Sequence, residues 1–323
     1  MKTLSLKSIL SLQENVPLAM YTTLKVGGPA RYFVIAKNTD EMVSAVQEAH
    51  SAGVSVVVIG GGSNVLVSDL GFSGLVVIAK NDHVQAQGAH IIAEAGAVLA
   101  RVSRVAYGSG LSGLEFGVGI PGSVGGAVVG NASNFIGAAK DVVHEVLALD
   151  EKGKTRALSN AECRFWYRHS VFKEKPWIVL QVTFALAEKP KGEIKARMDE
   201  ITVYKKKTQK TKYPTSGCMF KNPRLETAET RAHAESKGLG EGIRYSEDME
   251  CETVPLRVLL EKLNMKGFQI GGIAISESNA NFLENRGGAT AEDVIMMMSV
   301  IKQKVRDHFG IQLFDEVQMI GFK

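Results

Sequence analysis

The 323-residue sequence lacks any long hydrophobic run and carries little excess charge. No apolar stretch approaches the roughly 20 residues that a membrane-spanning helix needs, and residues 1–15 contain no signal-peptide core. A formal net charge of +4 is too small to indicate a nucleic-acid partner, although it is compatible with an anionic small ligand. We therefore expect a cytoplasmic protein that binds neither membrane nor nucleic acid.

Cysteine is also scarce, and its three copies are widely spaced. Cys163, Cys218 and Cys251 form no CxxC pair, so the sequence predicts neither a disulfide framework nor a thiolate metal site. The seven histidines show no HExxH or similar ligand spacing. These absences indicate a reducing compartment and no bound metal.

What the sequence does contain is a glycine turn between two apolar runs. The β-branched residues 56–59 predict a fully buried strand, and the glycines at 60–62 then remove every Cβ from the turn. Such a turn lets an anion approach successive backbone N–H groups. It is not a Rossmann fingerprint, because Val65 occupies the third glycine position and a strand follows. A hairpin without a ligand remains the alternative for this turn alone.

A second glycine-rich stretch spans residues 117–133. Six of the fourteen residues from 117 to 130 are glycine, and Pro121 and Ser123 add a rigid turn and a hydroxyl. Small residues at this density permit close approach either of a flat ligand or of a neighbouring helix. Two such stretches, separated by short strands, indicate one extended, phosphate-bearing cofactor.

Periodicity predicts a mixed helix and strand protein, and 45% hydrophobic residues suffice for two or three domain cores. Strands are expected at residues 31–36, 54–59, 75–79, 84–87, 90–95, 142–149, 178–186, 269–275 and 311–320. Helices are expected at residues 39–53 with Thr39 as N-cap, and at 98–107, 193–207, 255–263 and 291–309. Within the last helix, residues 296–298 are expected in the core. Residues 224–254 show little apolar periodicity.

Six motifs, in order along nearly the whole chain, resemble those of UDP-N-acetylenolpyruvoylglucosamine reductases, flavoenzymes of peptidoglycan precursor synthesis. The motifs are residues 60–64, 119–127, 167–173, 216–223, 266–272 and 316–321. The resemblance implies an α+β chain, with an FAD-binding domain of the vanillyl-alcohol-oxidase type in two α/β subdomains and a C-terminal α+β substrate domain. A short segment before the Ser-Gly motif indicates the subtype that lacks an extra tyrosine loop.

The resemblance also implies domain boundaries and binding residues. The expected parts are an N-terminal segment 1–22, an FAD-binding domain 23–189 (subdomains about 23–78 and 79–189), a connector 190–212 and a substrate domain 213–323. Non-covalent FAD is expected at Gly60, Gly61, Gly62, Ser63, Asn64, Pro121, Gly122, Ser123, Gly126 and Asn131. Substrate contacts are expected at Tyr167, Lys221, Asn222, Lys266 and Asn279.

Three residues carry the implied chemistry. Arg168 matches an arginine that binds the enolpyruvyl carboxylate, and its alternative is a surface or interdomain ion pair. Cys218 stands where most relatives carry a serine that protonates substrate C2. A thiol, with an ordinary pKa of about 8.5, is still mostly protonated at neutral pH and can do the same, while the alternative is a small buried hydrophobe. Glu316 completes the implied site, and its alternative is an exposed strand acid.

The implied reaction is the NADPH-dependent reduction of UDP-N-acetylglucosamine enolpyruvate to UDP-N-acetylmuramate through bound FAD. NADPH would reduce the flavin and leave, and hydride would then reach substrate C3 while C2 is protonated. A flavin-dependent alcohol oxidase or dehydrogenase of the same fold remains the alternative activity, and a sugar-nucleotide-binding protein without flavin is the non-enzymatic one. The expected partners are the UDP-sugar and NADPH alone, with the chain a monomer.

Overall fold

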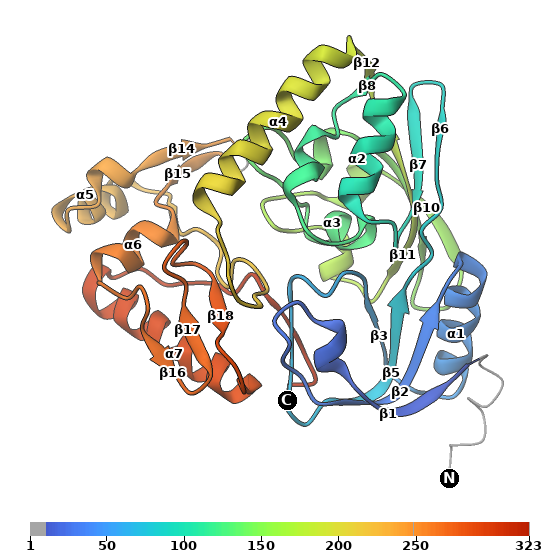
Figure 1. Cartoon of the computed structure of the whole chain (residues 1–323), viewed down its shortest axis with the longest axis horizontal. Helices are drawn as coiled ribbons and strands as arrows, with labels where there is room; N and C mark the ends of the chain where they lie inside the picture. Colours follow the sequence, from blue (N-terminus) through green and yellow to red (C-terminus); the bar gives the residue numbers. More distant parts are fainter. Residues whose placement is uncertain (1–10, 248, 323) are drawn as a thin grey trace. The chain divides into compact units, whose positions relative to one another are not determined.

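The computed structural model describes residues 11–247 and 249–322. The chain divides into two compact units (Figure 1). The first unit contains the described residues up to Val16, Pro29–Gly62 and Phe72–Lys207, and the second contains Pro17–Gly28, Ser63–Gly71 and the described residues from Thr208 onward. Two N-terminal segments therefore fold with the C-terminal half of the chain.

The first unit begins with a four-stranded sheet in the order β1-β2-β5-β3. Its strands are β1 (Gln13–Pro17), β2 (Pro29–Ala36), β3 (Val56–Ile59) and β5 (Phe72–Ala79). Both β2 and β3 pair in parallel with β5, as expected for a strand, helix, strand unit. The prediction that β3 is fully buried is wrong for residues 56–58, which are half-buried because β3 is an edge strand; only Ile59 is buried.

Helix α1 (Thr39–Ser51) packs its apolar face, which includes Met42 and Val46, into the core beside this sheet. The expected N-cap Thr39 is wrong by one residue. The side chain of Asn38 accepts a hydrogen bond from the Glu41 N–H at 2.8 Å, and Thr39 instead donates its hydroxyl to Glu94. Asparagine caps helices as well as threonine does, so the two positions could not be distinguished by type.

A five-stranded antiparallel sheet completes the first unit, in the order β10-β9-β11-β7-β6. Its strands are β6 (Val84–Gln87), β7 (His90–Glu94), β9 (Val143–Leu149), β10 (Thr155–Ser159) and β11 (Ile178–Ala185). Helices α2 (Leu99–Gly108) and α3 (Val124–Val129) lie against it (Figure 1) and bury Val102 and Val128 in its core.

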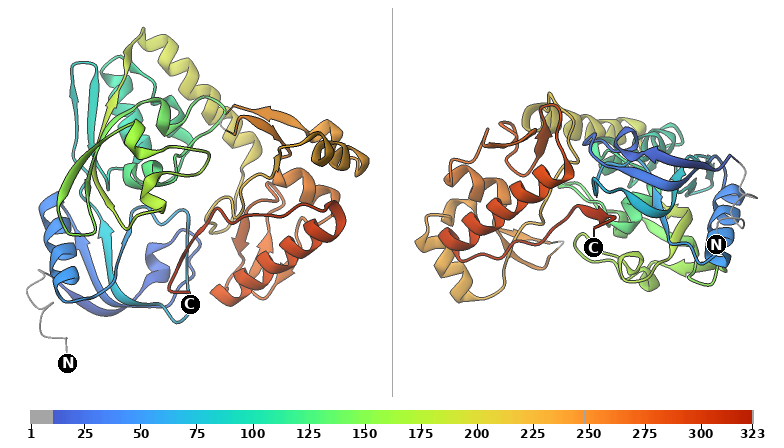
Figure 2. Two further views of the ribbon diagram at one scale, coloured as in Figure 1. Left: turned by 180° about the vertical axis from the view of Figure 1, so that it is seen from behind. Right: turned by 90° about the horizontal axis from the view of Figure 1, so that it is seen from below.

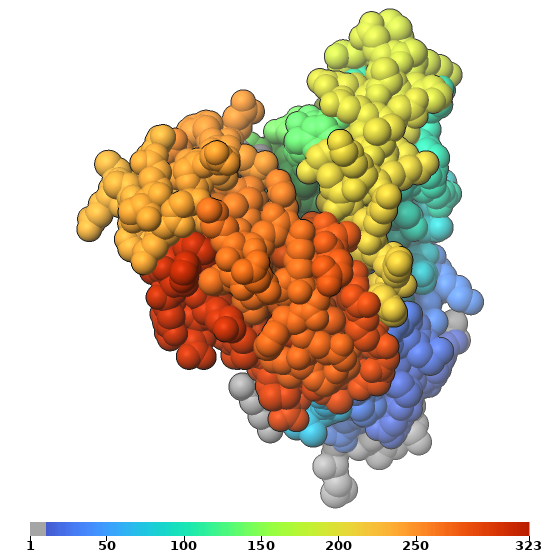
Figure 3. Space-filling view, turned by 60° about the vertical axis from the view of Figure 1, so that its left-hand side comes forward, coloured from blue at the N-terminus to red at the C-terminus, as the bar shows by residue number. Residues whose placement is uncertain are grey.

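Beyond this sheet, the short strands β8 (Leu111–Ser112) and β12 (Ala187–Glu188) pair with one another. The mostly polar helix α4 (Lys191–Thr208), yellow in Figure 3, buries only Ile194 and Ile201. Its exposed charged face is what the sequence predicts for residues 193–207.

Among its described residues, the second unit contains two small three-stranded antiparallel sheets and three α-helices. One sheet joins β13 (Arg224–Leu225), β15 (Cys251–Thr253) and β14 (Arg244–Ser246), and the other joins β16 (Gln269–Ile270), β17 (Ile273–Ile275) and β18 (Leu283–Asn285). The helices are α5 (Ala228–Ser236), α6 (Leu256–Lys262) and α7 (Ala291–Phe309), and α7 contacts β16 and β17 (Figures 1 and 2). Strand β19 (Gln318–Ile320) pairs in parallel with β4 (Val65–Val67).

Helix α7 has the bounds that its sequence predicts. Thr290 accepts a hydrogen bond from the Asp293 N–H, and Gly310 ends the helix with φ +66°. Both are standard signals for helix ends. The expected burial of residues 296–298 is confirmed for Met297 and Met298, whereas Met296 is 43% exposed because it falls outside the apolar face.

Two predicted strands of the second half are wrong in extent. Residues 269–275 form a hairpin rather than one strand, because Gly271, with φ +49°, turns the chain between β16 and β17. Of residues 311–320 only β19 is a strand. Asp315 makes an isolated backbone bridge with Phe220 and an ion pair with Lys302 at 2.7 Å. No helix among the described residues could cross a membrane.

Candidate active site

The two glycine stretches lie against one another in the first unit. A Cβ placed on Gly61 would come 2.7 Å from the Cα of Gly122, and one on Gly60 would come 2.0 Å from the hydroxyl of Ser123. Real Cβ atoms do not approach other atoms this closely. The contact therefore requires glycine at position 61, where the neighbour is backbone, whereas at position 60 the Ser123 hydroxyl would have to move. The sequence predicted two cofactor loops, and the structure places their backbones side by side.

The second glycine stretch is ordered by hydrogen bonds along its own length. Ser123 is the N-cap of α3, where its hydroxyl accepts from the Gly126 N–H at 3.3 Å. After the helix, the buried side chain of Asn131 donates to the carbonyl of Trp166 at 2.9 Å and accepts from the Lys140 N–H at 3.0 Å. Asn131 therefore connects the end of the glycine stretch to the arginine motif.

The arginine motif is a tight turn. Trp166 and His169 exchange two backbone hydrogen bonds, of 3.1 and 3.0 Å, with Arg168 between them at φ +54°. A left-handed backbone at a non-glycine residue costs of order 1–3 kcal/mol and is frequent at functional sites. Lys173 steadies the turn by donating its ammonium to the Arg168 carbonyl at 2.9 Å. His169 bonds Glu174 at 3.0 Å, and this hydrogen bond lowers the pKa of the Glu174 carboxyl.

The Arg168 side chain contacts both Tyr167 and Ser133. Its guanidinium lies 5.2 Å from the centre of the Tyr167 ring, within the range of a cation–π contact. One terminal guanidinium nitrogen donates to the Ser133 hydroxyl at 2.6 Å, and the second terminal nitrogen donates to the Ser133 carbonyl at 3.4 Å. Neither Ser133 contact was predicted from the sequence.

Cys218 follows a turn in the second unit. Gly217 has φ +76°, while a Cβ there would meet nothing within 4 Å, so the backbone conformation rather than space favours glycine. The Gly217 N–H donates to the Thr215 hydroxyl at 3.2 Å. The half-buried Cys218 makes an isolated backbone bridge with Phe282, which fixes its Cα independently of its side chain.

Backbone hydrogen bonds place Glu316 beside the residue after Cys218. The Glu316 N–H donates to the Met219 carbonyl at 2.9 Å. The side-chain amide of Asn64 donates to the backbone carbonyl of Glu316 at 3.2 Å. The residues that follow each of them form the parallel strands β4 and β19, which pair with one another. The second unit thus brings Asn64 and Glu316 into contact next to the Cys218 loop.

Two predicted substrate residues, Lys221 and Asn222, follow in the same loop of the second unit. Lys221 donates its backbone N–H to the Phe314 carbonyl at 2.9 Å and has a half-buried side chain. The carbonyl oxygen of the Asn222 side chain accepts from the Leu256 N–H at 3.1 Å. Asn222 therefore binds a backbone N–H in the first turn of α6.

The remaining predicted substrate residues lie on loops. The Asn279 side chain accepts from the Asn281 N–H at 3.1 Å, and the exposed Lys266 pairs with Glu261 at 2.8 Å. Sequence reasoning missed Asn281, whose buried amide bonds both the N–H and the carbonyl of Phe220 and so orders the Cys218 loop. Its position in a polar run directly before an apolar residue was the available signal.

The three cysteines differ in their surroundings. Cys163 is fully buried in the first unit, and burial, aided by the charge of Glu162, raises its thiol pKa to about 12. Cys251 is half-buried in β15. Of the three, only Cys218 lies on a loop beside other predicted site residues.

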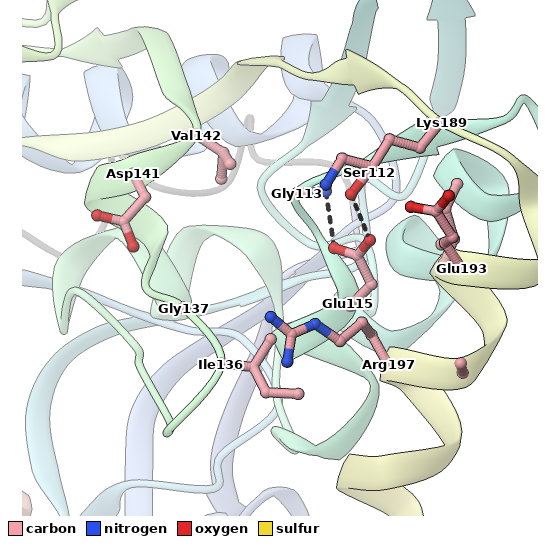
Figure 4. Close-up of a pocket in the computed structure, with 12 residues that line it drawn as sticks. Ser112, Gly113, Glu115, Ile136, Gly137, Asp141, Val142, Lys189, Glu193 and Arg197 are labelled. Atoms are coloured by element: carbon pink, nitrogen blue, oxygen red, sulfur yellow. Dashed lines mark hydrogen bonds between the residues drawn. The ribbon is translucent and has the colours of Figure 1, made fainter.

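A separate cavity of about 480 Å³ lies within the first unit (Figure 4). Its wall includes Glu115, whose two carboxylate oxygens accept from the Ser112 hydroxyl and the Gly113 N–H, each at 2.7 Å. The other charged residues of the wall have mixed signs, and none of the residues predicted for cofactor, substrate or catalysis lines the cavity. We therefore assign it no part in the chemistry.

Comparison with known families matches both halves of the chain. Residues 30–159 match a model described as an FAD binding domain, and residues 209–320 match the C-terminal domain of UDP-N-acetylenolpyruvoylglucosamine reductase. These matches, with the mixed helices and strands of both units, confirm the predicted α+β fold class.

Curated relatives match over almost the whole length. The UDP-N-acetylenolpyruvoylglucosamine reductase of Caldanaerobacter subterraneus is 35% identical over 98% of this chain and 97% of its own, and that of Latilactobacillus sakei is 35% identical over 97% and 95%. The crystal structure of the Thermus caldophilus reductase is 29% identical, with a TM-score of 0.74 over 96% of this chain and 99% of its own. The chain therefore belongs to the UDP-N-acetylenolpyruvoylglucosamine reductase family.

Proposed function

We propose that this chain reduces UDP-N-acetylglucosamine enolpyruvate to UDP-N-acetylmuramate, with NADPH as reductant and non-covalent FAD as cofactor. The observation that carries the proposal is 35% identity to reductases of that name over nearly the full length of both chains. The alternative alcohol oxidase would share the FAD-binding domain, but the C-terminal domain model that matches residues 209–320 is specific to the reductase.

The residues of the first unit fit FAD. The contact of Gly61 with Gly122 leaves a surface of bare backbone from two loops, and a diphosphate needs such a surface because side chains would hold its oxygens away from the amides. Bound there by the predicted glycines, Ser123 and the neighbouring loop residues, FAD would supply hydride transfer between NADPH and the substrate.

Each proposed catalytic residue has a task suited to its chemistry. The planar guanidinium of Arg168 would bind the substrate carboxylate through two parallel hydrogen bonds and stabilise the negative charge that develops there. The Cys218 thiol would donate its proton to C2, and Glu316 would orient or share that proton. Tyr167, Lys221, Asn222, Lys266 and Asn279 would contact the substrate.

We propose further that residues 23–189 bind FAD and that residues 213–323 bind the substrate. Residues 190–212 would connect these two domains. The matched ranges 30–159 and 209–320 support this division. We also propose that the chain is a monomer in the cytoplasm. None of its three cysteines, all of them among the described residues, forms a disulfide, as expected in a reducing compartment.

The proposed reaction is tested by the isotopic mass of its product. Incubation with the enolpyruvyl nucleotide and NADPH should give a product two hydrogens heavier. In deuterated water at least one of the two should be deuterium, because the proton delivered to C2 comes from solvent. If the mass of the nucleotide does not change, and the electrons of NADPH pass only to oxygen or to a carbonyl compound that is reduced to an alcohol, the oxidase or dehydrogenase activity is favoured.

FAD should leave the protein completely on acid precipitation. Covalent attachment in related folds uses a histidine or cysteine beside the cofactor, whereas the first loop presents Ser63 and Asn64. Absorbance of the supernatant should account for all flavin measured before precipitation. Yellow colour retained by the washed pellet would contradict this expectation.

Gly61→Ala should raise the Kd for FAD at least tenfold, equivalent to about 1.4 kcal/mol. The added methyl would meet the Gly122 backbone at 2.7 Å, and backbone cannot rotate away as a side chain can. Gly108→Ala is the matched control, because a Cβ there meets nothing within 4 Å. Titration of the apoprotein with FAD gives the Kd, and equal affinity in both variants would contradict the proposed cradle.

A further inference from the structure

We propose that Ser133 is a positioning residue for the Arg168 guanidinium and thereby determines how tightly the carboxylate of the substrate is bound. This inference rests on the function proposed above. It concerns a residue to which neither the six motifs nor the family resemblance assigns a role.

The geometry of the contact is specific to a hydroxyl residue. Both terminal guanidinium nitrogens of Arg168 donate to Ser133, one to the hydroxyl at 2.6 Å and one to the carbonyl at 3.4 Å. Any residue supplies the carbonyl, but the shorter bond needs the side-chain oxygen of Ser133, which alanine lacks and threonine retains. A charge-assisted hydrogen bond of this length fixes the plane of the guanidinium, and that plane decides whether a carboxylate can be met by two parallel bonds.

The loop that carries Ser133 is itself rigid. Ser133 forms a backbone bridge with Ala138, and the adjacent Asn134 donates its amide to the Phe116 carbonyl at 2.9 Å. Two residues earlier, Asn131 is bonded to the Trp166 carbonyl at 2.9 Å, at the start of the arginine turn. The hydroxyl is therefore presented from a loop that is tied directly to the turn it serves.

The arginine turn is equally constrained at its own end. Arg168 has φ +54°, and Lys173 donates to its carbonyl at 2.9 Å. With the backbone fixed at one end and the guanidinium fixed by Ser133 at the other, the flexible stem between them has few conformations left. Ordering a long side chain in advance removes an entropic cost that ligand binding would otherwise carry.

Ligand affinity tests this role separately from turnover. Calorimetry should show that Ser133→Ala binds the product, UDP-N-acetylmuramate, about tenfold more weakly than the parent, the effect expected from losing one hydrogen bond to a charged group. Affinity for UDP-N-acetylglucosamine, which lacks the carboxylate, should not change. Ser133→Thr keeps the hydroxyl and should retain most of the affinity for the product.

Half-reaction kinetics provide the second readout. In Ser133→Ala, reoxidation of the reduced flavin by the enolpyruvyl nucleotide should slow about tenfold, while reduction by NADPH should keep its rate. Because Ser133 is argued to act through Arg168, adding Ser133→Ala to Arg168→Lys should change reoxidation less than about twofold.

Three results would overturn the inference. They are unchanged product affinity in Ser133→Ala, equal weakening for both nucleotides, and an undiminished effect in the Arg168→Lys background. If the flavin of the parent protein is not reoxidised by the enolpyruvyl nucleotide, the proposed function fails and the inference fails with it. If the parent is reoxidised and Ser133→Ala behaves like it, the positioning role alone is wrong.

Discussion

Cys218→Ala should lower turnover by roughly 10²–10⁴-fold, the range expected for removing a positioned general acid. By the motif resemblance this cysteine takes the place of a proton-donating serine, and an ordinary thiol still carries its proton at neutral pH. Cys218→Ser should therefore remain active. Since a serine hydroxyl does not ionise in the range where thiols do, the serine variant should also keep its activity to higher pH than the parent.

Single-turnover reoxidation of the reduced flavin separates this role from a packing role. The loop is fixed by backbone contacts, such as the bridge of Cys218 with Phe282, so alanine should leave FAD reduction and nucleotide binding intact. Cys251→Ala is the matched control, because Cys251 is likewise a half-buried cysteine of the second unit. A Cys218→Ala protein as fast as the parent would remove Cys218 from the mechanism and restore its interpretation as a small buried hydrophobe.

Arg168→Lys should slow reoxidation by the enolpyruvyl nucleotide by about 10²–10³-fold, as the loss of a transition-state hydrogen-bond donor does elsewhere. Lysine keeps the charge but lacks the planar fork that meets a carboxylate with two bonds. Reduction by NADPH should survive, because no charge develops on the substrate in that half of the reaction.

Arg164→Lys provides a matched control for the arginine substitution. Arg164 also has a left-handed backbone, with φ +48°, but its exposed side chain pairs with Glu174. Its replacement should change either half-reaction less than about twofold, as expected for a surface ion pair. Stopped-flow absorbance of the flavin gives both rates. Equal losses in the two halves for Arg168→Lys would indicate that Arg168 only supports the structure.

Much of the architecture could be predicted from local patterns. The apolar face of α7 gave its bounds, and the glycines at 60–62 and 122 gave two loops that the structure places in contact. Sequence periodicity did not predict the shortest strands. Strands β13 to β15 have two or three residues each, too few for periodicity to indicate them within residues 224–254.

Long-range contacts account for the rest. Ser133 and Arg168 are 35 residues apart, and Asn64 and Glu316 are 252 apart, so nothing in the local sequence indicates that either pair forms. The folding of residues 63–71 with the second unit has the same cause, because it depends on the pairing of β4 with β19. Motif resemblance could indicate Arg168, Cys218 and Glu316 as candidates, but it could not indicate what holds them in place.

The most direct test of the proposed activity is an anaerobic two-step titration of the purified holoprotein, followed by flavin absorbance. NADPH should bleach the flavin band in the first step, and the enolpyruvyl nucleotide should restore it in the second, with one UDP-N-acetylmuramate formed per flavin. UDP-N-acetylglucosamine should leave the flavin reduced. A reduced flavin that the enolpyruvyl nucleotide does not reoxidise, but that oxygen reoxidises rapidly, would contradict the reductase function.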